Sequence, residues 1–287
     1  MSGVLATAKL LISSVMIAIS GAFRTYIAYI LIGHDVIFSN ITAVFLIVYA
    51  IYAFDRIKGG DEDNINRKEL TGARKDIAYV VCASSFICGI LILFLHDLIL
   101  IVVIPFIVGY LYSKKIVIGK YSFSFKGGMG MKNLVVALTW GIFITGIVMK
   151  GHSDPIAAIS IFSFLFIKTF INTVMNDFSD VDGDKSAGLM TLPICFGEKK
   201  TRCLLMRIHM IEHVIIAIIM VMGMLEFEII ILLSCFFSGV IYISFFTTTS
   251  INVNTGSGIK NVSYQLFYRW EFYLAVGLKT LSKIIII

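Results

Sequence analysis

Long apolar stretches recur along the whole chain and constrain its fold more than any other feature. They lie near residues 9–33, 38–55, 76–95, 97–113, 133–149, 155–176, 204–224, 227–247 and 268–287. Each is long enough to cross the hydrocarbon layer of a bilayer as a helix, which takes about 17 to 25 residues. Backbone groups that face lipid must satisfy their own hydrogen bonds, so helices are the expected structure. The sequence therefore predicts an all-α, polytopic integral membrane protein, with nine transmembrane helices in one bundle and a single domain over 1–287.

The overall composition agrees with a membrane location. Hydrophobic residues make up 58% of the chain and charged residues 15%, and the mean hydropathy is +0.93. These values lie outside the range of soluble globular domains, so the lipid bilayer is an expected partner. The five cysteines show no CxxC spacing and are interpreted as packing residues.

The distribution of basic residues predicts the orientation of the bundle. The even-numbered connections, 56–75, 114–132, 177–207 and 248–269, carry 18 Lys and Arg residues, whereas the short odd-numbered connections carry only Lys150. The positive-inside rule therefore places the N-terminus and all long loops in the cytoplasm, at the plasma membrane if the source is prokaryotic. No basic stripe is interleaved with exposed aromatic residues, so a nucleic-acid partner is not expected.

A dense acidic cluster follows the sixth apolar stretch, in the segment NDFSDVDGDKSAGLMTLP (176–193). If the helix continues, Asp177, Asp180 and Asp184 point into an arc of about 60°, while Asp182 points elsewhere. Converging carboxylates repel one another unless a hard cation lies among them, and Mg²⁺ binds a few carboxylates and leaves its other positions to water and phosphate. The alternative is a solvated acidic loop without a metal.

Another acidic cluster, the first along the chain, lies at the end of the second apolar stretch, on the same predicted side. The segment YAFDRIKGGDEDNINRKEL (52–70) contains Asp55, Asp61, Glu62 and Asp63. Two acidic clusters at helix ends that face one compartment predict a metal site that holds a diphosphate.

The segment HMIEH (209–213) offers a separate metal pattern. His209 and His213 are one helical turn apart, with Glu212 between them, which matches a known zinc spacing. The segment is expected near the cytoplasmic start of a helix, and no third protein ligand beyond this motif is evident. The alternative is a set of interfacial polar residues with a structural glutamate. His34, His96 and His152 each lie singly in short connections.

The second acidic cluster along the chain also carries a family resemblance. The spacing D-x2-D-x3-D followed by G-x2-TLP comprises Asp177, Asp180, Asp184, Gly188 and residues 191–193. It resembles the second aspartate-rich motif of the UbiA superfamily of intramembrane prenyltransferases. The resemblance implies nine transmembrane helices, with both acidic motifs on cytoplasmic loops after helices 2 and 6, here 55–75 and 177–203. The segments LYSKK (111–115) and KNLVVALTW (132–140) are similar to family segments, though less specific.

The first acidic cluster departs from the family pattern. Family members usually read N-x3-D-x3-D, and alignment puts Asp55 at the asparagine, Gly59 at the first aspartate and Asp63 at the second. One carboxylate is therefore missing. Either Asp61 or Glu62 replaces it, or one metal ion is held weakly.

The resemblance implies a chemistry and a set of site residues. Members ionise an allylic or polyprenyl diphosphate with Mg²⁺, which neutralises the leaving group. The resemblance assigns catalysis to Asp63, Asp177 and Asp180, and metal binding to these three and Asp184. Residues expected to bind the diphosphate or line the pocket are Arg24, Asp55, Arg67, Tyr112, Lys126 and Lys132. Arg24 and Lys168 lie within apolar stretches, where ionisable side chains usually face the bundle interior.

Three functions stay open at this point. In the first, the prenyl group of a polyprenyl diphosphate is transferred to a hydrophobic acceptor, either an aromatic ring or a lipid-like alcohol. In the second, the carbocation is captured by its own double bonds, because the superfamily also contains terpene cyclases. In the third, the protein is an ion or lipid transporter whose acidic clusters only bind cations. The sequence favours the first, a Mg²⁺-dependent intramembrane prenyltransferase, and leaves the oligomeric state open.

Overall fold

The computed structural model describes residues 2–58, 73–112, 115–118, 121–124, 129–186, 188–249 and 277. Its helices are α1 (Ser2–Leu31), α2 (Phe38–Lys58), α4 (Lys75–Leu95), α5 (Ile99–Tyr112), α6 (Met131–Val148), α7 (Pro155–Ser179), α8 (Val181–Ser186), α9 (Leu192–Phe196), α10 (Glu198–Val221) and α11 (Ile229–Thr249). Two short strands, β1 (Lys115–Ile118) and β2 (Tyr121–Ser124), pair antiparallel between α5 and α6.

The fold is a membrane-type helical bundle, as the apolar stretches predict. Eight of the nine stretches correspond to α1, α2, α4, α5, α6, α7, α10 and α11. Within the described part of the chain, six helices are long and apolar enough to cross a membrane, and α5 and α11 contribute shorter apolar segments. The ninth stretch, 268–287, falls outside the described residues except for residue 277, so the count of nine stays a prediction. The hairpin is one departure from an all-helical chain.

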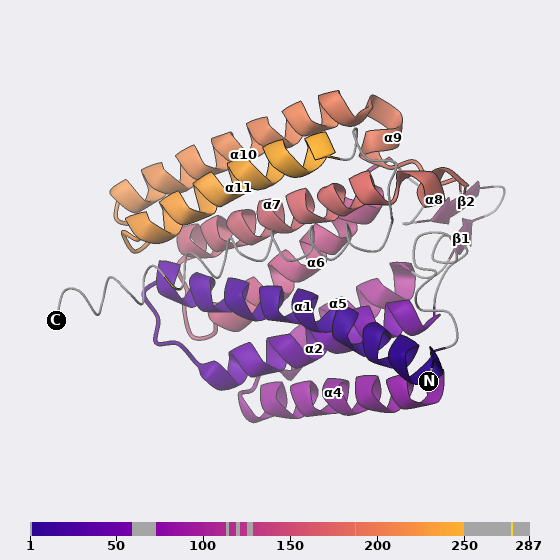
Figure 1. Ribbon diagram of the computed structural model, residues 1–287. Coiled ribbons are helices and arrows are strands. Elements are labelled where there is room, and N and C mark those ends of the chain that lie inside the picture. Colours follow the sequence, from indigo (N-terminus) through magenta and orange to yellow (C-terminus); the bar gives the residue numbers. More distant parts are fainter. Residues whose placement is uncertain are drawn as a thin grey trace.

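Several described segments that connect the long helices lie at one end of the bundle. Figure 1 shows the N-terminal end of α1, the β1–β2 hairpin, α8 and α9 at the same end. The turns from α1 to α2, from α6 to α7 and from α10 to α11 lie at the other end. This arrangement agrees with the prediction for the N-terminus and for the described parts of the connections 114–132 and 177–207, which share one side. Their assignment to the cytoplasm stays a prediction from the positive-inside rule.

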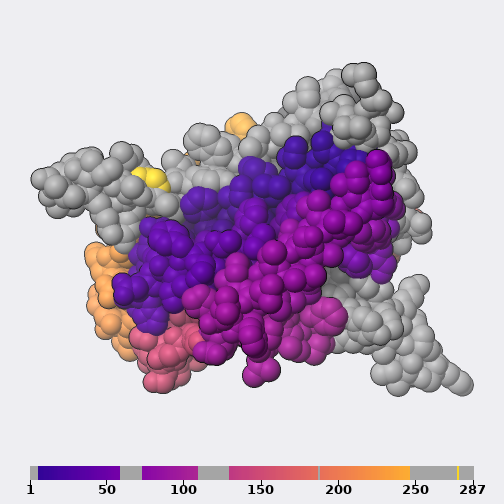
Figure 2. Space-filling model, turned by 90° about the horizontal axis from the view of Figure 1, so that it is seen from below, coloured from indigo at the N-terminus to yellow at the C-terminus, as the bar shows by residue number. Residues whose placement is uncertain are grey.

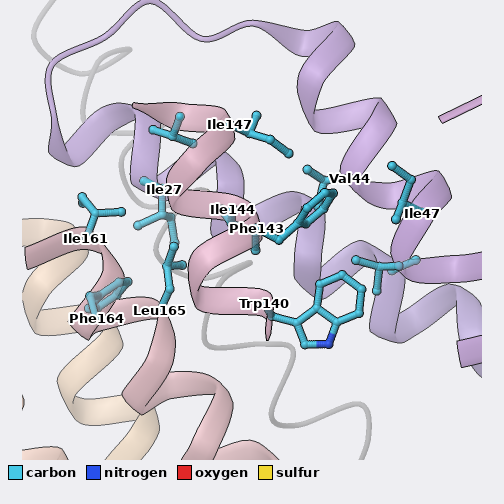
Figure 3. Packing of buried hydrophobic residues seen from close by; sticks show 14 of the residues in the cluster. Ile27, Val44, Ile47, Trp140, Phe143, Ile144, Ile147, Ile161, Phe164 and Leu165 are labelled. Atoms are coloured by element: carbon cyan, nitrogen blue, oxygen red, sulfur yellow. The ribbon is translucent and has the colours of Figure 1, made fainter. Parts of the chain in front are cut away.

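The core lies where α1, α2, α6 and α7 meet. Figure 3 shows these helices contributing interlocking side chains. Fully or almost fully buried members include Ile27, Ile47, Phe143, Ile147 and Ile161. Lipid tails are as apolar as these side chains, so close van der Waals packing rather than exclusion from water holds such helices together.

Small residues permit the closest approach between α2 and α4. A methyl group placed on Gly89 of α4 would lie 2.7 Å from a side-chain carbon of Ile47 and 3.2 Å from the carbonyl oxygen of Ala43. On its other side α4 is strongly apolar and exposed, with Val80, Phe94 and Leu95 exposed by 60% or more. Figure 2 shows α4 spread across the face seen from below. An exposed apolar face of this kind suits contact with lipid.

Candidate active site

Helix α7 carries the second acidic cluster to the loop-rich end of the bundle. The helix starts at Pro155, whose fixed φ suits a first helical position, and the carboxylate of Asp154 caps it by accepting from the Ile156 amide at 2.9 Å. The helix is 25 residues long and ends at Ser179. Asp177 therefore lies in its last turn. The predicted loop 177–203 in fact contains the end of α7, the short helices α8 and α9 and the start of α10.

The predicted continuous helix through the aspartates is interrupted at one residue. Asp180 has φ −104° and ψ 7°, and α8 starts immediately after it. The amide of Asp184 still donates to the carbonyl of Asp180 at 2.9 Å, as in a helical turn. Asp180 is half-buried, whereas Asp182 is exposed. The bend therefore keeps Asp177 and Asp184 on one side and leaves Asp182 in solvent.

Lys132, from the first turn of α6, joins the two buried aspartates. Its ammonium lies 2.8 Å from Oδ1 of Asp177 and 3.5 Å from Oδ2 of Asp184. The two aspartates are 1% and 2% exposed. Asp177 and Asp184 thus converge on one point although α7 ends between them.

Asn133 fixes the other oxygen of Asp177. Its side-chain amide donates to Oδ2 of Asp177 at 2.8 Å, and Asn133 is fully buried. Hydrogen bonds from a neutral donor to a charged acceptor contribute about 1.5–3 kcal/mol. The bond holds the carboxylate so that Oδ1 faces Lys132.

The G-x2-TLP segment returns the chain to the start of α6. Gly188 has φ 69°, a left-handed conformation that suits glycine, and the next residue donates its amide to the carbonyl of Asp184 at 2.8 Å. Leu192 then packs beside Gly130, where a methyl group would lie 3.4 Å from its side chain. Gly130 is the N-cap residue of α6, two positions before Lys132. The motif therefore ties the acidic cluster to the helix that carries its polar partners.

The cluster holds more negative than positive charge among the residues named. The carboxylates of Asp177 and Asp184 both lie within 3.5 Å of the ammonium of Lys132, and Asp180 is close enough to act electrostatically on Asp184. Burial raises the pKa of Asp184 to about 6, against the opposing effect of Lys132 and with further increase from Asp177 and Asp180. A carboxyl group with a raised pKa is one whose negative charge is incompletely compensated. The site is therefore electrostatically prepared for an additional cation.

The donor atoms fit a hard divalent cation. Apart from Lys132, Asp177 Oδ1 and Asp184 Oδ2 have no hydrogen-bond donor among the described residues. Carboxylate oxygens at a helix end, with phosphate and water completing the shell, are the ligands that Mg²⁺ prefers. Asp177 and Asp184 are described residues whose carboxylates converge and could hold it, whereas Asp180 does not join them in a group of three ligand atoms within 4.8 Å of one another.

The arrangement matches a known family along most of the chain. A model of the UbiA prenyltransferase family matches residues 11–255. The chain belongs to this family. The match includes the buried aspartates and their partners on α6, as well as the first acidic cluster.

UbiA relatives similar to this chain share one name. A digeranylgeranylglyceryl phosphate synthase from Methanococcus aeolicus is 31% identical over 186 residues, which cover 63% of this chain and 62% of that protein. A protein of the same name from Natronomonas pharaonis is 37% identical over 82 residues, or 28% of this chain and 29% of the relative. The chain therefore matches less than two thirds of the length of these relatives.

Solved UbiA structures share the fold. A UbiA homologue from Archaeoglobus fulgidus, bound to GPP and Mg²⁺, superposes with a TM-score of 0.64 over 95% of this chain and 98% of that one, at 17% identity. A digeranylgeranylglyceryl phosphate synthase structure gives a TM-score of 0.54, with 95% and 99% coverage and 17% identity. At this identity the likeness establishes the fold alone.

The structure describes only some of the remaining predicted site residues of this UbiA protein. Arg24 is 5% exposed inside the bundle and donates through Nη1 to Thr169 Oγ1 of α7 at 2.6 Å. Asp55 lies near the end of α2 and is exposed. Tyr112 is the last residue of α5, and its side chain is not among those described. Residues outside the described part are Gly59, Asp61, Glu62, Asp63, Arg67 and Lys126.

Asn133 is the member of the cluster that sequence reasoning did not single out. Its signal was present, since an asparagine directly after Lys132 and before an apolar helix has few reasons to be there. Only the fold shows that this helix end meets the end of α7, a contact between residues 44 positions apart.

Proposed function

We propose that the protein is a Mg²⁺-dependent intramembrane prenyltransferase that moves the prenyl group of a polyprenyl diphosphate onto the hydroxyl of a glycerol-phosphate lipid. The observation that carries the proposal is the convergence of buried Asp177 and Asp184 on Lys132 at the loop-rich end of a UbiA-type bundle. Membership of the family supports the reaction class, and the shared name of the relatives supports the acceptor class.

The aspartates hold the head of the donor in this proposal. Asp177, Asp180 and Asp184 bind Mg²⁺ from one side, and Asp63 supplies a ligand from the first acidic cluster. Bound Mg²⁺ would supply positive charge to the diphosphate oxygens as the leaving group departs. Asn133 keeps the Asp177 carboxylate in one orientation, so that its ligand atom is fixed before substrate arrives.

Basic side chains complete the donor site. Lys132 is positioned by Asp177 at the site, and its ammonium can turn towards a diphosphate oxygen once a metal ion takes over the carboxylates. Arg67 and Lys126 are proposed to do the same from neighbouring connections. Arg24 and Tyr112 are proposed to line the pocket further along, with Arg24 held by Thr169.

The reaction exchanges one carbon–oxygen bond for another. The bond between C1 of the prenyl chain and the diphosphate breaks, and its electron pair leaves with the diphosphate. The acceptor hydroxyl forms a new ether bond to C1 and releases its proton to water or to the departing diphosphate. Burial of the apolar chain inside the bundle keeps water from competing as the nucleophile.

The name of the relatives favours a lipid alcohol over an aromatic ring as acceptor. Digeranylgeranylglyceryl phosphate contains two prenyl groups on a glyceryl phosphate, so its synthesis ends in prenyl transfer to such a molecule. We propose the same acceptor class here, with a geranylgeranyl-sized donor.

Diphosphate release by the purified protein in detergent tests the proposal. The donors are allylic diphosphates from geranyl to geranylgeranyl, each with Mg²⁺ or with a chelator. Release is expected only with Mg²⁺ and with a prenylglyceryl phosphate acceptor, and the ether product should appear in equal amount by mass spectrometry. A cyclic hydrocarbon formed without acceptor would identify a cyclase instead. Absence of release under all conditions, in protein that is folded and monodisperse, would favour the transporter.

The variant Asp182→Asn is the matched control. It removes one negative charge from the same segment, but Asp182 is exposed and lies outside the converging set. Wild-type release by this variant, together with loss in Asp177→Asn, would tie turnover to the converging carboxylates rather than to the net charge of the loop.

A further inference from the structure

A second buried ionisable cluster lies on α10, away from the aspartates. His209, Glu212 and His213 share one face of this helix and are only 1%, 2% and 4% exposed. Their position differs from the sequence expectation, because α10 begins at Glu198 and the cluster lies in the middle of the helix rather than near its start. A glutamate and two histidines in the middle of a membrane-spanning helix are costly unless they have a specific role.

The hydrogen bonds of the two histidines fix which ring nitrogen carries the proton. Nε2 of His209 lies 3.0 Å from the carbonyl oxygen of Phe236 on α11, and Nδ1 of His213 lies 2.8 Å from the carbonyl oxygen of His209. A carbonyl only accepts, so each of these nitrogens donates. Neutral rings then present lone pairs at Nδ1 of His209 and Nε2 of His213. A histidine that ligates a metal commonly donates its other N–H to such a carbonyl.

Glu212 lacks the partners that a buried carboxylate requires. Neither of its oxygens has a hydrogen bond of acceptable geometry within the described part of the chain, and the same holds for Nε2 of His213. Oε2 of Glu212 lies 2.7 Å from Nδ1 of His213, but that nitrogen is directed at the carbonyl of His209. Burial of an uncompensated carboxylate is strongly unfavourable.

We propose that His209, Glu212 and His213 bind one divalent transition-metal ion of the zinc class. One ligand atom from each residue lies within 4.8 Å of the other two, so small side-chain rotations bring all three onto one ion. Two imidazoles and one carboxylate are a donor set typical of Zn²⁺, with a fourth position for water or another ligand. The all-oxygen aspartate cluster suits Mg²⁺ instead, so the two sites differ in the ion that they select.

The neighbouring helix is shaped to hold the site. A methyl group placed on Gly239 of α11 would lie 2.2 Å from Cε1 of His209, so only glycine leaves room for this ring. The ring of Phe236 stacks on His209, with centroids 5.8 Å apart and planes inclined by 11°, and it also packs against His213. Lys168 of α7 lies near His209 and donates to the carbonyl of Cys235 at 3.0 Å, directly before Phe236. Its ammonium adds no ligand and leaves the carboxylate of Glu212 as the anionic member.

Cobalt(II) is the probe for this site, because its visible absorption reports coordination by nitrogen and oxygen at low symmetry and needs no enzymatic activity. The protein is purified in detergent without a histidine tag, freed of metal by chelation and titrated with Co²⁺ in excess Mg²⁺, which occupies oxygen-only sites. We expect one Co²⁺ per chain and displacement of its spectrum by Zn²⁺. Glu212→Gln and His213→Ala each alter a direct ligand and should weaken binding by at least the roughly ten- to hundredfold that loss of a partner behind a ligand costs.

Two further variants separate the site from general effects. The double variant His34→Ala/His152→Ala removes a histidine pair from the connections between α1 and α2 and between α6 and α7. The centroids of these two rings are 3.7 Å apart, and their removal should leave the spectrum unchanged. Gly239→Ala replaces no ligand, but its methyl group would collide with the ring of His209 and displace it, so it should weaken binding as the ligand variants do. The proposal is overturned if folded wild-type protein shows no Zn²⁺-displaceable spectrum, or if Glu212→Gln binds Co²⁺ with wild-type affinity. The wild-type titration decides even if a ligand variant fails to fold. None of these results depends on the prenyl-transfer proposal.

Discussion

The two buried clusters solve the same electrostatic problem in different ways. At the end of α7, the carboxylate of Asp177 is almost fully buried but has Asn133 at one oxygen and Lys132 at the other. In the middle of α10, the carboxylate of Glu212 is equally buried and has no hydrogen bond among the described residues. The first cluster has protein partners for its carboxylates before any metal binds, although the raised pKa of Asp184 shows that they compensate its charge incompletely. In our proposal the second cluster is complete only with a bound ion. The comparison therefore separates a site that takes up its metal ion with the substrate from a site that holds its metal ion permanently.

The largest expected effect comes from the aspartate that has both partners. Asp177→Asn keeps the shape of the side chain but removes its charge, and should lower Mg²⁺-dependent diphosphate release by about 10²–10³-fold, the usual result of losing one preorganised electrostatic group. Release is measured at saturating donor and acceptor. Activity within about threefold of wild type would show that the α7 cluster is not the reaction site.

Asn133→Ala should have the next largest effect. The substitution leaves every proposed metal ligand in place but frees the Asp177 carboxylate to rotate, so Mg²⁺ affinity or turnover should fall by about ten- to a hundredfold. A Mg²⁺ titration of diphosphate release distinguishes the two. Thr139→Ala on the same helix is the control, because its hydroxyl bonds only to the backbone one turn earlier. Equal losses in both variants would indicate general disturbance of α6.

The fold can be predicted from the sequence more fully than the contacts of the candidate site. The bundle was predictable because lipid imposes a simple rule, that apolar stretches of sufficient length become helices. Helical spacing predicted that Asp177, Asp180 and Asp184 converge, and the structure brings Asp177 and Asp184 to Lys132 despite the break at Asp180. Their pairing with Lys132 and Asn133 could not be predicted, because the contact joins residues 44 and more positions apart and depends on how α6 meets α7.

For the HMIEH segment too, the spacing in the sequence does not give the position of the side chains in the fold. Its spacing indicated that the histidines share a helix face. The sequence also placed the segment at the membrane interface, where polar side chains need no metal to explain them. The earlier start of α10 moves the segment to the middle of the helix, and its burial against Phe236 and Gly239 of α11 follows from the packing of two helices. Spacing therefore identified the residues, and depth in the bundle gave them their significance.

Glu212→Met tests whether burial of the Glu212 carboxylate destabilises the fold. In metal-free protein the substitution replaces a buried carboxylate that lacks hydrogen bonds with an apolar side chain of similar size, so it should stabilise the fold by about 1–3 kcal/mol. That corresponds to a rise in the apparent Tm of a few degrees, of order 2–4 °C per kcal/mol in a chain of this size. With Zn²⁺ added, the wild type should become the more stable of the two. A lower Tm for Glu212→Met in metal-free protein would mean that the carboxylate already has a stabilising partner.

The smallest effect concerns the pH dependence of the aspartate cluster. Burial raises the pKa of Asp184 from 3.8 to about 6, so the folded protein binds this proton more tightly than the unfolded chain does. The stability that this proton contributes is complete below about pH 4 and is lost as the pH rises through about 6. Asp184→Asn stays neutral throughout. Its Tm minus the wild-type Tm, measured without Mg²⁺, should therefore increase between pH 4 and pH 7, by a few degrees at most.

Adding Mg²⁺ favours the ionised carboxylate and should reduce that Tm difference at pH 7. Asp182→Asn, at an exposed position, should give a flat difference over the same range. A flat difference for Asp184→Asn as well would show that Lys132 already compensates the cluster fully, and that the α7 site has no unmet need for a cation.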